Sequence, residues 1–219
     1  MNWELVTRLG EAQILVPAAL VAALAMLRER DARPLVLRWL GALLLAIAIT
    51  TATKVAFLGW GLGSAWLDFT GVSGHAMFAT AVYPVLGHGL GSNLRGRAGT
   101  WGVACGWVLA AVIGVSRIAV DAHSWSEVVA GWLLGGSVTL VVFARDVQRA
   151  ISPAWAVLLV AWLLYMPAGG PPSQAHSWVT RVALALSGHD APYTRADLHR
   201  AWRAADGVRA ERRLERILS

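Results

Sequence analysis

Long apolar runs, separated by short connections that carry arginine, restrict the fold of this 219-residue chain most strongly. An apolar run of about 20 residues can cross a membrane as an α-helix, because a helix satisfies its own backbone hydrogen bonds in lipid. Hydrophobic residues make up 57% of the chain and charged residues only 15%. We therefore predict an all-α integral membrane helical bundle. Its six expected transmembrane segments are residues 11–28, 36–58, 74–92, 99–116, 125–144 and 153–167.

The chain is expected to form one transmembrane domain, residues 1–167, followed by a tail, residues 168–219. A charged cluster, rather than a small-residue cleavage site, follows the apolar stretch Ile14–Leu27, so we interpret that stretch as a membrane helix. The tail carries eight arginines. It is interpreted either as a basic helical segment on the surface of anionic lipid or as a solvated helical appendage.

Two local signals in the tail predict helix ends. Thr194 and Asp197 have the spacing of a capping box. Gly207 is expected to separate two short helices.

The distribution of arginine predicts the orientation in the membrane. Cytoplasmic connections carry an excess of Lys and Arg, and such residues lie between segments one and two, three and four, and five and six. They are Arg28, Arg30, Arg33, Arg38, Arg95, Arg97, Arg145 and Arg149. The opposite side is then expected to be the periplasmic side of a bacterial inner membrane. It would hold the N-terminus, the 59–73 and 117–124 loops and the tail. This pattern accounts for the net charge of +6, which does not indicate a nucleic-acid partner.

Tryptophans lie near the ends of several apolar runs, at Trp39, Trp60, Trp101 and Trp125. They are typical of an aromatic belt at the membrane surface. Packing against lipid or within the core is the alternative for each of them.

The first cluster of polar residues is Ser116-Arg117, then His123, then Glu127. The step of four residues from His123 to Glu127 spans one helical turn, so the carboxylate can reach the imidazole. A carboxylate on one ring nitrogen leaves the other nitrogen free to attack. Arg117 can hold a phosphate through its planar donors. Asp121 is a rival carboxylate, although the spacing favours Glu127.

Two further signals fall on the same expected membrane face. Ser73-Gly74-His75 opens the third segment, where exposed N–H groups at a helix start can bind phosphate and His75 can donate a proton to a leaving oxygen. Lys54, the only lysine in the chain, ends the second segment. It offers a compact charge for a phosphoryl oxygen, although a lysine there can also be a flanking residue that reaches towards water.

Together these residues resemble the type 2 phosphatidic acid phosphatase superfamily, which includes bacterial acid phosphatases and vanadium haloperoxidases. Its three motifs are Lys followed seven residues later by Arg-Pro; Pro-Ser-Gly-His; and Ser-Arg, five residues, His, three residues, Asp. The resemblance covers about residues 50–135 of this chain. It is carried by Lys54, Ser73, Gly74, His75, Ser116, Arg117, His123 and Glu127.

The resemblance implies a phosphohistidine mechanism without a metal or cofactor. His123 would attack phosphorus, Glu127 would orient it, and His75 would protonate the leaving oxygen and then activate water. The phosphoryl oxygens would be held by Lys54, Ser73, Gly74 and Arg117.

Each of the three motifs departs from the family pattern at one point. Gly61 and Leu62 stand where the first motif has Arg-Pro, so one phosphate-binding charge is missing or comes from elsewhere. Val72 replaces the proline of the second motif, and Glu127 replaces the aspartate of the third.

The expected substrate is a lipid phosphate monoester or pyrophosphate. Undecaprenyl pyrophosphate, phosphatidylglycerol phosphate, phosphatidic acid and the phosphates of lipid A all remain candidates. Two other functions stay open: a lipid phosphotransferase that uses the same histidine, and a non-catalytic lipid-binding protein with a degenerate site.

Overall fold

The computed structural model of this chain describes residues 2–28, 32–92, 94, 96–144, 151–171 and 173–218, with side chains up to residue 207. Every regular element in these ranges is a helix. One isolated bridge pairs Ser64 with Phe69 inside the long loop after the third helix. The predicted all-α fold class is therefore confirmed.

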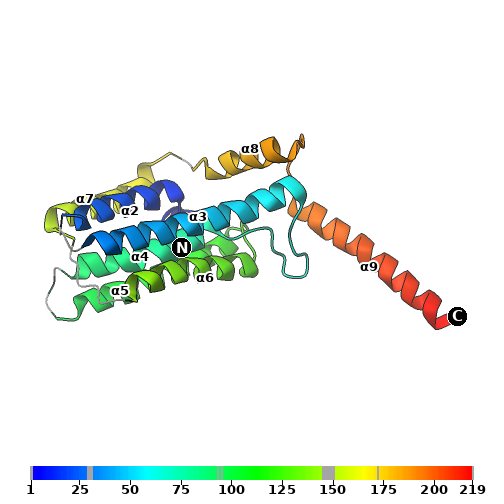
Figure 1. The fold of residues 1–219 in the computed structure, drawn as a ribbon, viewed down its shortest axis with the longest axis horizontal. Coiled ribbons are helices and arrows are strands. Elements are labelled where there is room, and N and C mark those ends of the chain that lie inside the picture. The colour runs from blue at the N-terminus through cyan, green and yellow to red at the C-terminus, as the bar shows by residue number, and fades with distance from the viewer. Residues whose placement is uncertain are drawn as a thin grey trace.

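Each of the six predicted segments corresponds to one helix of a bundle (Figure 1). These helices are α2 (Ala12–Met26), α3 (Arg33–Trp60), α4 (Gly74–Gly91), α5 (Ala98–Ala119), α6 (Trp125–Phe143) and α7 (Pro153–Gly169). By length and composition, α3, α5 and α6 can each cross a membrane, whereas α2 and α7 are apolar but shorter. The chain is thus a membrane protein built as a helical bundle.

The central helix of the bundle is α4, which is buried along most of its length. It approaches α5 closely because glycines face each other across the interface. A Cβ atom on Gly102 would collide with the carbonyl of Gly87, and one on Gly87 would collide with Gly102. Small residues permit such approach between helices in lipid, where packing replaces the hydrophobic effect. This contact fixes the position of α4 along its axis relative to α5.

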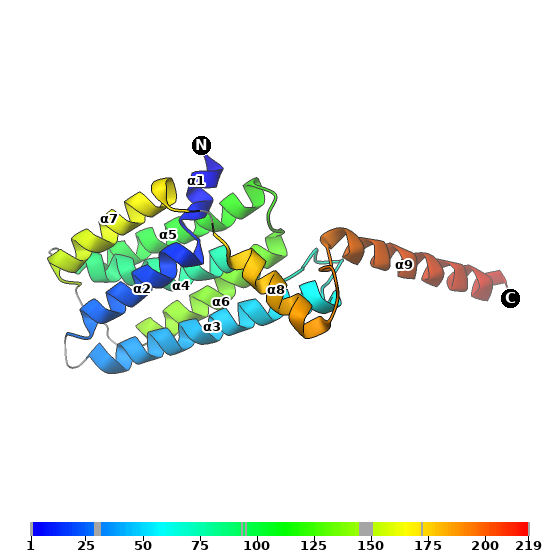
Figure 2. The same ribbon diagram turned by 90° about the horizontal axis from the view of Figure 1, so that it is seen from above.

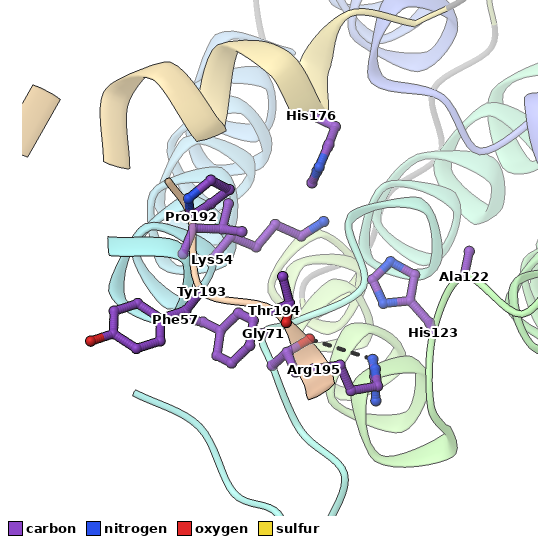
Figure 3. A pocket seen from close by; sticks show the side chains of 12 residues that line it. Lys54, Phe57, Gly71, Ala122, His123, His176, Pro192, Tyr193, Thr194 and Arg195 are labelled. Atoms are coloured by element: carbon purple, nitrogen blue, oxygen red, sulfur yellow. Dashed lines mark hydrogen bonds between the residues drawn. The ribbon is translucent and has the colours of Figure 1, made fainter. Parts of the chain in front are cut away.

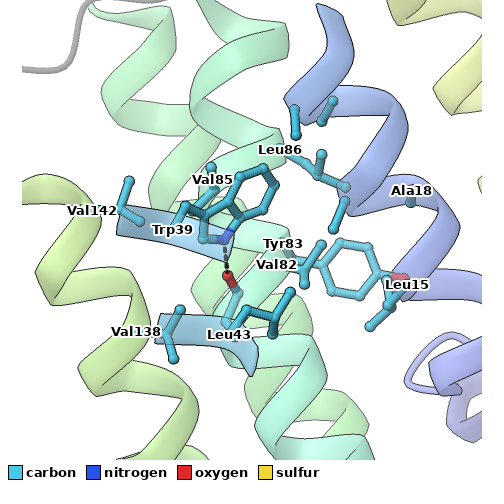
Figure 4. Close-up of a cluster of buried hydrophobic side chains, with 14 of the residues drawn as sticks. Leu15, Ala18, Trp39, Leu43, Val82, Tyr83, Val85, Leu86, Val138 and Val142 are labelled. Carbon is cyan, nitrogen blue, oxygen red and sulfur yellow. Dashed lines mark hydrogen bonds between the residues drawn. The ribbon is translucent and has the colours of Figure 1, made fainter. Parts of the chain in front are cut away.

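Trp39 belongs to the core, not to an aromatic belt. It is 1% exposed and its indole N–H donates to the carbonyl oxygen of Ala81 on α4 at 3.1 Å (Figure 4). The belt interpretation is therefore wrong for this residue. A buried tryptophan needs a partner for its N–H, and α4 supplies that partner. By contrast, Trp60, Trp101 and Trp125 are 46%, 70% and 56% exposed.

The bundle has two distinct ends. Helices α2, α4 and α6 finish at one end, where α3, α5 and α7 begin (Figure 1). The arginines that sequence analysis grouped together and that the structure describes, Arg28, Arg33, Arg38 and Arg97, flank these helix ends. The others of that group, Arg30, Arg95, Arg145 and Arg149, lie outside the described residues. The 61–73 and 120–124 loops lie at the opposite end.

Three further helices lie at or near this opposite end. The short helix α1 (Trp3–Arg8) was not predicted. In the tail, α8 (Ala175–Ser187) packs against α3, and α9 (Arg195–Leu218) extends away from the bundle (Figure 2). The predicted capping box is present, because Thr194 and Asp197 exchange side-chain to backbone hydrogen bonds. The predicted break at Gly207 is wrong, since α9 is continuous there; one glycine costs a helix only about 1 kcal/mol.

Candidate active site

His123 and Glu127 are in direct contact at the start of α6. The His123 Nδ1 atom lies 2.6 Å from Glu127 Oε2. Glu127 is the third residue of α6, and His123 precedes the N-cap residue, Ser124. The two residues therefore do not share a helical turn, and the prediction from their spacing is wrong on this point. A capping box, in which Ser124 and Glu127 bond reciprocally, directs the carboxylate back towards His123.

The Glu127 side chain is fully buried and its carboxylate is held from several directions. Oε1 accepts hydrogen bonds from the backbone N–H and the hydroxyl of Thr70, and Oε2 accepts one from the N–H of Ser124. Thr70 belongs to the long loop after α3. The same loop is joined to α6 by a bond from the N–H of Ser73 to the Glu127 carbonyl, at 3.0 Å. These contacts fix both the carboxylate and the loop that begins α4.

The four predicted phosphate-binding residues gather beside His123. Ser73 and Gly74 stand at the N-terminus of α4, Lys54 projects from the last turns of α3, and Arg117 lies in the last turn of α5. Two buried atoms in this set, Ser73 Oγ and Arg117 Nε, have no hydrogen-bond partner among the described residues. Each is a donor that an oxyanion can satisfy. One terminal nitrogen of Arg117 donates to Thr7 Oγ1 at 2.7 Å, which anchors the guanidinium to α1.

His75 occupies the first turn of α4 and packs against Gly10, which lies in the connection between α1 and α2. The packing is close, because a Cβ atom added to Gly10 would lie 2.9 Å from the Cβ of His75. Arg117, Lys54 and His123 all lie close enough to His75 to interact with it electrostatically. The structure therefore brings together the seven residues to which the resemblance assigns a role, from four different helices and the loops between them.

The tail contributes residues to this site that sequence reasoning missed. One terminal nitrogen of Arg195, at the start of α9, donates to both oxygens of Glu127, at 3.0 and 2.9 Å. The other donates to Asp68 Oδ2 at 2.6 Å and to its carbonyl oxygen at 2.7 Å. Among eight tail arginines, the one sequence signal for Arg195 was its place just inside the Thr194 capping box. Thr70 carried no signal at all.

Two cavities meet at the site. One, of about 330 Å³, is lined by His123, Arg195 and other residues of the loops and tail (Figure 3). The other, of about 670 Å³, runs between the α1–α2 junction, α3, α4 and α8. His75 and Arg117 line only the larger cavity, and His123 lines only the smaller one. Lys54, Ala122 and His176 line both, so the cavities adjoin there.

The surroundings of His123 favour its neutral form. Burial lowers the pKa of His123 below its ordinary value of 6.5, although the hydrogen bond to Glu127 opposes that shift. The charges of Lys54 and Arg117 lower the pKa further. A neutral ring with Nδ1 held by a carboxylate keeps its Nε2 lone pair available.

Asp121, the rival carboxylate, is exposed and stands in a left-handed turn with φ of 52°. Within the described ranges, no group of three or more His, Cys, Asp and Glu side chains is arranged to hold a metal ion.

The fold and these contacts define an integral membrane helical protein with a histidine pair and a cluster of cations at one end of the bundle. The chain belongs to the PAP2 superfamily, whose family pattern matches residues 35–151. This membership supports activity as a phosphoric ester hydrolase. A relative from Klebsiella pneumoniae, named as an uncharacterized 22.5 kDa protein in the cps region, is 36% identical over 212 residues, covering 92% of this chain and all of the relative. No solved structure gives a significant match.

Proposed function

We propose that this protein is a membrane lipid phosphatase that removes phosphate from a lipid monoester or pyrophosphate through a phosphohistidine, without a metal ion. The observation that carries the proposal is the arrangement of the two cavities. The nucleophile candidate, His123, opens into the smaller cavity, and the candidate acid, His75, opens into the larger one. In-line displacement needs the attacking atom and the leaving oxygen on opposite sides of phosphorus.

In the proposed first step, Nε2 of His123 attacks phosphorus while the bond from phosphorus to the lipid oxygen breaks. His75 transfers a proton to that oxygen, so the lipid leaves as a neutral alcohol or as a monophosphate. Glu127 accepts a hydrogen bond from the Nδ1–H group of His123 and balances the positive charge that develops on the ring. Lys54, Arg117, Ser73 and the N-terminus of α4 at Gly74 stabilise the phosphoryl oxygens. In the second step His75 takes a proton from water, whose oxygen attacks phosphorus while the bond from phosphorus to Nε2 of His123 breaks and phosphate is released.

The character of the larger cavity supports a lipid leaving group. Its walls include apolar side chains from three helices, Ile47, Phe78, Trp178 and Val179 among them. It reaches from these to the catalytic end at Lys54, His75 and Arg117. A volume of about 670 Å³ accommodates the chain region next to a headgroup. After the lipid leaves, the attacking water would reach phosphorus from this same side, where His75 can take its proton.

The proposal extends to location. We place the protein in a bacterial inner membrane with the site facing the periplasm, because arginines flank the helix ends opposite the site. The basic tail beyond Arg195 would lie on the membrane surface, where its arginines meet anionic lipid.

The test is phosphate release by the detergent-purified protein in excess EDTA. The panel is undecaprenyl pyrophosphate, phosphatidylglycerol phosphate, phosphatidic acid and lipid A. Release from at least one lipid is expected, with loss in His123→Ala, retention in the matched variant His88→Ala at the other end of α4, and inhibition by vanadate, which mimics the five-coordinate phosphoryl group.

Three results would contradict the proposal. Loss of activity in EDTA that magnesium restores would refute the metal-independent mechanism. A phosphorylated second lipid in place of free phosphate would identify a phosphotransferase. Release from no lipid, by folded protein, would favour a binding role.

A further inference from the structure

The C-terminal tail is docked onto the end of α3 through a specific set of contacts. The N–H of Tyr193 donates to the carbonyl oxygen of Leu58 at 2.9 Å, and His189 Nδ1 lies 2.8 Å from the carbonyl oxygen of Gly59. The Tyr193 ring covers Gly61, so that a Cβ atom there would lie 3.0 Å from the ring. Gly61 also has a φ of 68°, which disfavours other residues. The tail thus occupies the space that a side chain at position 61 would need.

Two residues beyond Tyr193, Arg195 enters the site and joins two carboxylates from different parts of the chain. Its contacts with Glu127 and Asp68 are all between 2.6 and 3.0 Å. Asp68 is bound in turn by His199, one turn further along α9, at 2.7 Å. A guanidinium shared between two carboxylates in this fork geometry is a strong and directional contact. It is more than a surface ion pair, because the Glu127 side chain is fully buried.

We propose that Arg195 is a positioning residue for the reaction: it clamps Glu127 against His123 and keeps the His123 ring in its uncharged, attacking form. This inference rests on the proposed function only for the role of His123 as nucleophile. Both terminal nitrogens of Arg195 are bound to carboxylates, so the residue acts through Glu127.

The charges around His123 determine how the loss of Arg195 would change the pH at which the His123 ring is protonated. The charged or titratable groups around His123 come from every neighbouring element: Lys54, His75, Arg117, Glu127, His176 and Arg195. Glu127 favours a protonated His123 ring, and Arg195 neutralises part of that influence. Without Arg195, the carboxylate would have the His123 ring as its nearest remaining cation. The ring would then take up its proton at a higher pH.

The experiment compares wild type with Arg195→Gln, Arg195→Lys and Arg200→Gln. Arg200 is the matched control, because it lies on the same helix, is 70% exposed and pairs only with Asp197 among the described residues. Two readouts are taken against pH: kcat/KM for phosphate release, and the rate at which diethyl pyrocarbonate acylates His123 without substrate, followed by peptide mass spectrometry. The acylation reports neutral imidazole directly, so it remains informative even if no substrate is found.

In Arg195→Gln, both midpoints are expected to move up by about one pH unit. Arg195→Lys should lie between this variant and wild type, and Arg200→Gln should match wild type. Unchanged midpoints in Arg195→Gln would overturn the inference. A tenfold rise in KM with unchanged midpoints would also overturn it, because Arg195 would then bind phosphate itself. If wild type acylates normally but releases no phosphate, the proposed function fails separately.

A second variant keeps the inference testable if Arg195→Gln does not fold. Asp68→Asn removes one anchor of Arg195 and leaves Glu127 untouched. Loss of this anchor loosens Arg195 from Glu127 and raises the midpoints, whereas loss of the Asp68 charge itself acts weakly in the other direction because Asp68 is 42% exposed. The midpoints should therefore move up, by less than in Arg195→Gln. A thermal unfolding curve in detergent establishes that it is folded, and a folded Asp68→Asn protein with wild-type midpoints would count against the clamp.

Discussion

At the scale of single residues, Glu127 links the capping of a helix to the proposed chemistry. The same carboxylate closes the capping box of α6, accepts two bonds from Thr70 and contacts His123. A helix N-terminus stabilises negative charge, so this position suits an ionised acid. The extra methylene relative to the family's aspartate is accommodated because the side chain folds back along the first turn of α6.

Glu127→Gln is expected to lower kcat by roughly a hundredfold to ten-thousandfold, with a small change in KM. The amide keeps the shape but loses the charge, and its NH₂ group can oppose the proton on Nδ1 of His123. Steady-state kinetics on the preferred lipid measures the effect. Glu127→Asp is the matched control and should lose less, since the charge remains. A Gln variant within tenfold of wild type would show that the carboxylate does not orient His123.

The pH dependence of wild type follows from the environment of His123. Because burial lowers the pKa of this histidine below 6.5, the ring stays neutral as the pH falls towards that value and gains its proton only below it. The acid side of the kcat/KM profile should therefore have its midpoint below about pH 6.5. A midpoint above this value, measured with a substrate whose own ionisation is accounted for, would contradict the assignment of His123 as a neutral nucleophile.

The carboxylate partner of His123 was predicted correctly, but for a different physical reason. The spacing favoured Glu127 over Asp121, and the 2.6 Å contact agrees with that choice. The physical reason differs, however, because His123 lies before the helix and a capping box provides the geometry. A four-residue step alone does not reveal whether a helix begins before or after its first residue.

At the scale of helices, the close approach of α4 and α5 positions the site. His75 stands at one end of α4 and Arg117 at the corresponding end of α5. Any shift of one helix along the other would therefore separate the candidate acid from a phosphate-binding cation. The glycine pair between the helices prevents such a shift by letting the backbones touch.

Gly102→Ala is expected to destabilise the bundle by about 1–3 kcal/mol, because the added methyl meets the Gly87 backbone, which cannot move aside. The measurement is thermal unfolding in detergent. Gly41→Ala on α3 is the matched control, since its Cβ would have nothing within 4 Å. It should be neutral or slightly stabilising. Equal unfolding temperatures for the two variants would mean that this interface tolerates separation.

Each of the six apolar runs was correctly predicted to form a helix, but the predicted first and last residues differ from those in the structure. The segment expected at 36–58 extends to Arg33–Trp60, and 99–116 extends to Ala98–Ala119. Polar residues in the last turns, such as Arg117, end an apolar run without ending a helix. The role of Trp39 was not predictable, because its position near a run end carries no information about a partner on another helix.

At the scale of the whole molecule, the arrangement of helix ends predicts which surfaces face each side of the membrane. In a chain whose only cysteine is replaced (Cys105→Ser), Trp66→Cys should react with a membrane-impermeant maleimide in intact cells. Leu94→Cys should react only after the membrane is opened. Both positions suit labelling, being 83% and 69% exposed. The reverse pattern would place the site in the cytoplasm.

The tail is part of the candidate site and not a separate appendage of the bundle. Helix α8 forms one wall of the larger cavity through His176, Trp178 and Val179. Arg195 then brings the first turn of α9 into contact with α6. The part of the chain expected to be peripheral thus contributes directly to the candidate site, while contact of the remaining α9 with a membrane surface stays a prediction.

The sequence by itself determined the helical class, the six segments of the bundle and the residues that gather at one end, because long apolar runs and motif spacings are local properties of the chain. Only the tertiary structure decided what surrounds Glu127. Thr70 and Arg195 reach it across separations of 57 and 68 residues. Such contacts depend on how loops and tail pack, and packing between distant segments leaves no periodic signal in the sequence.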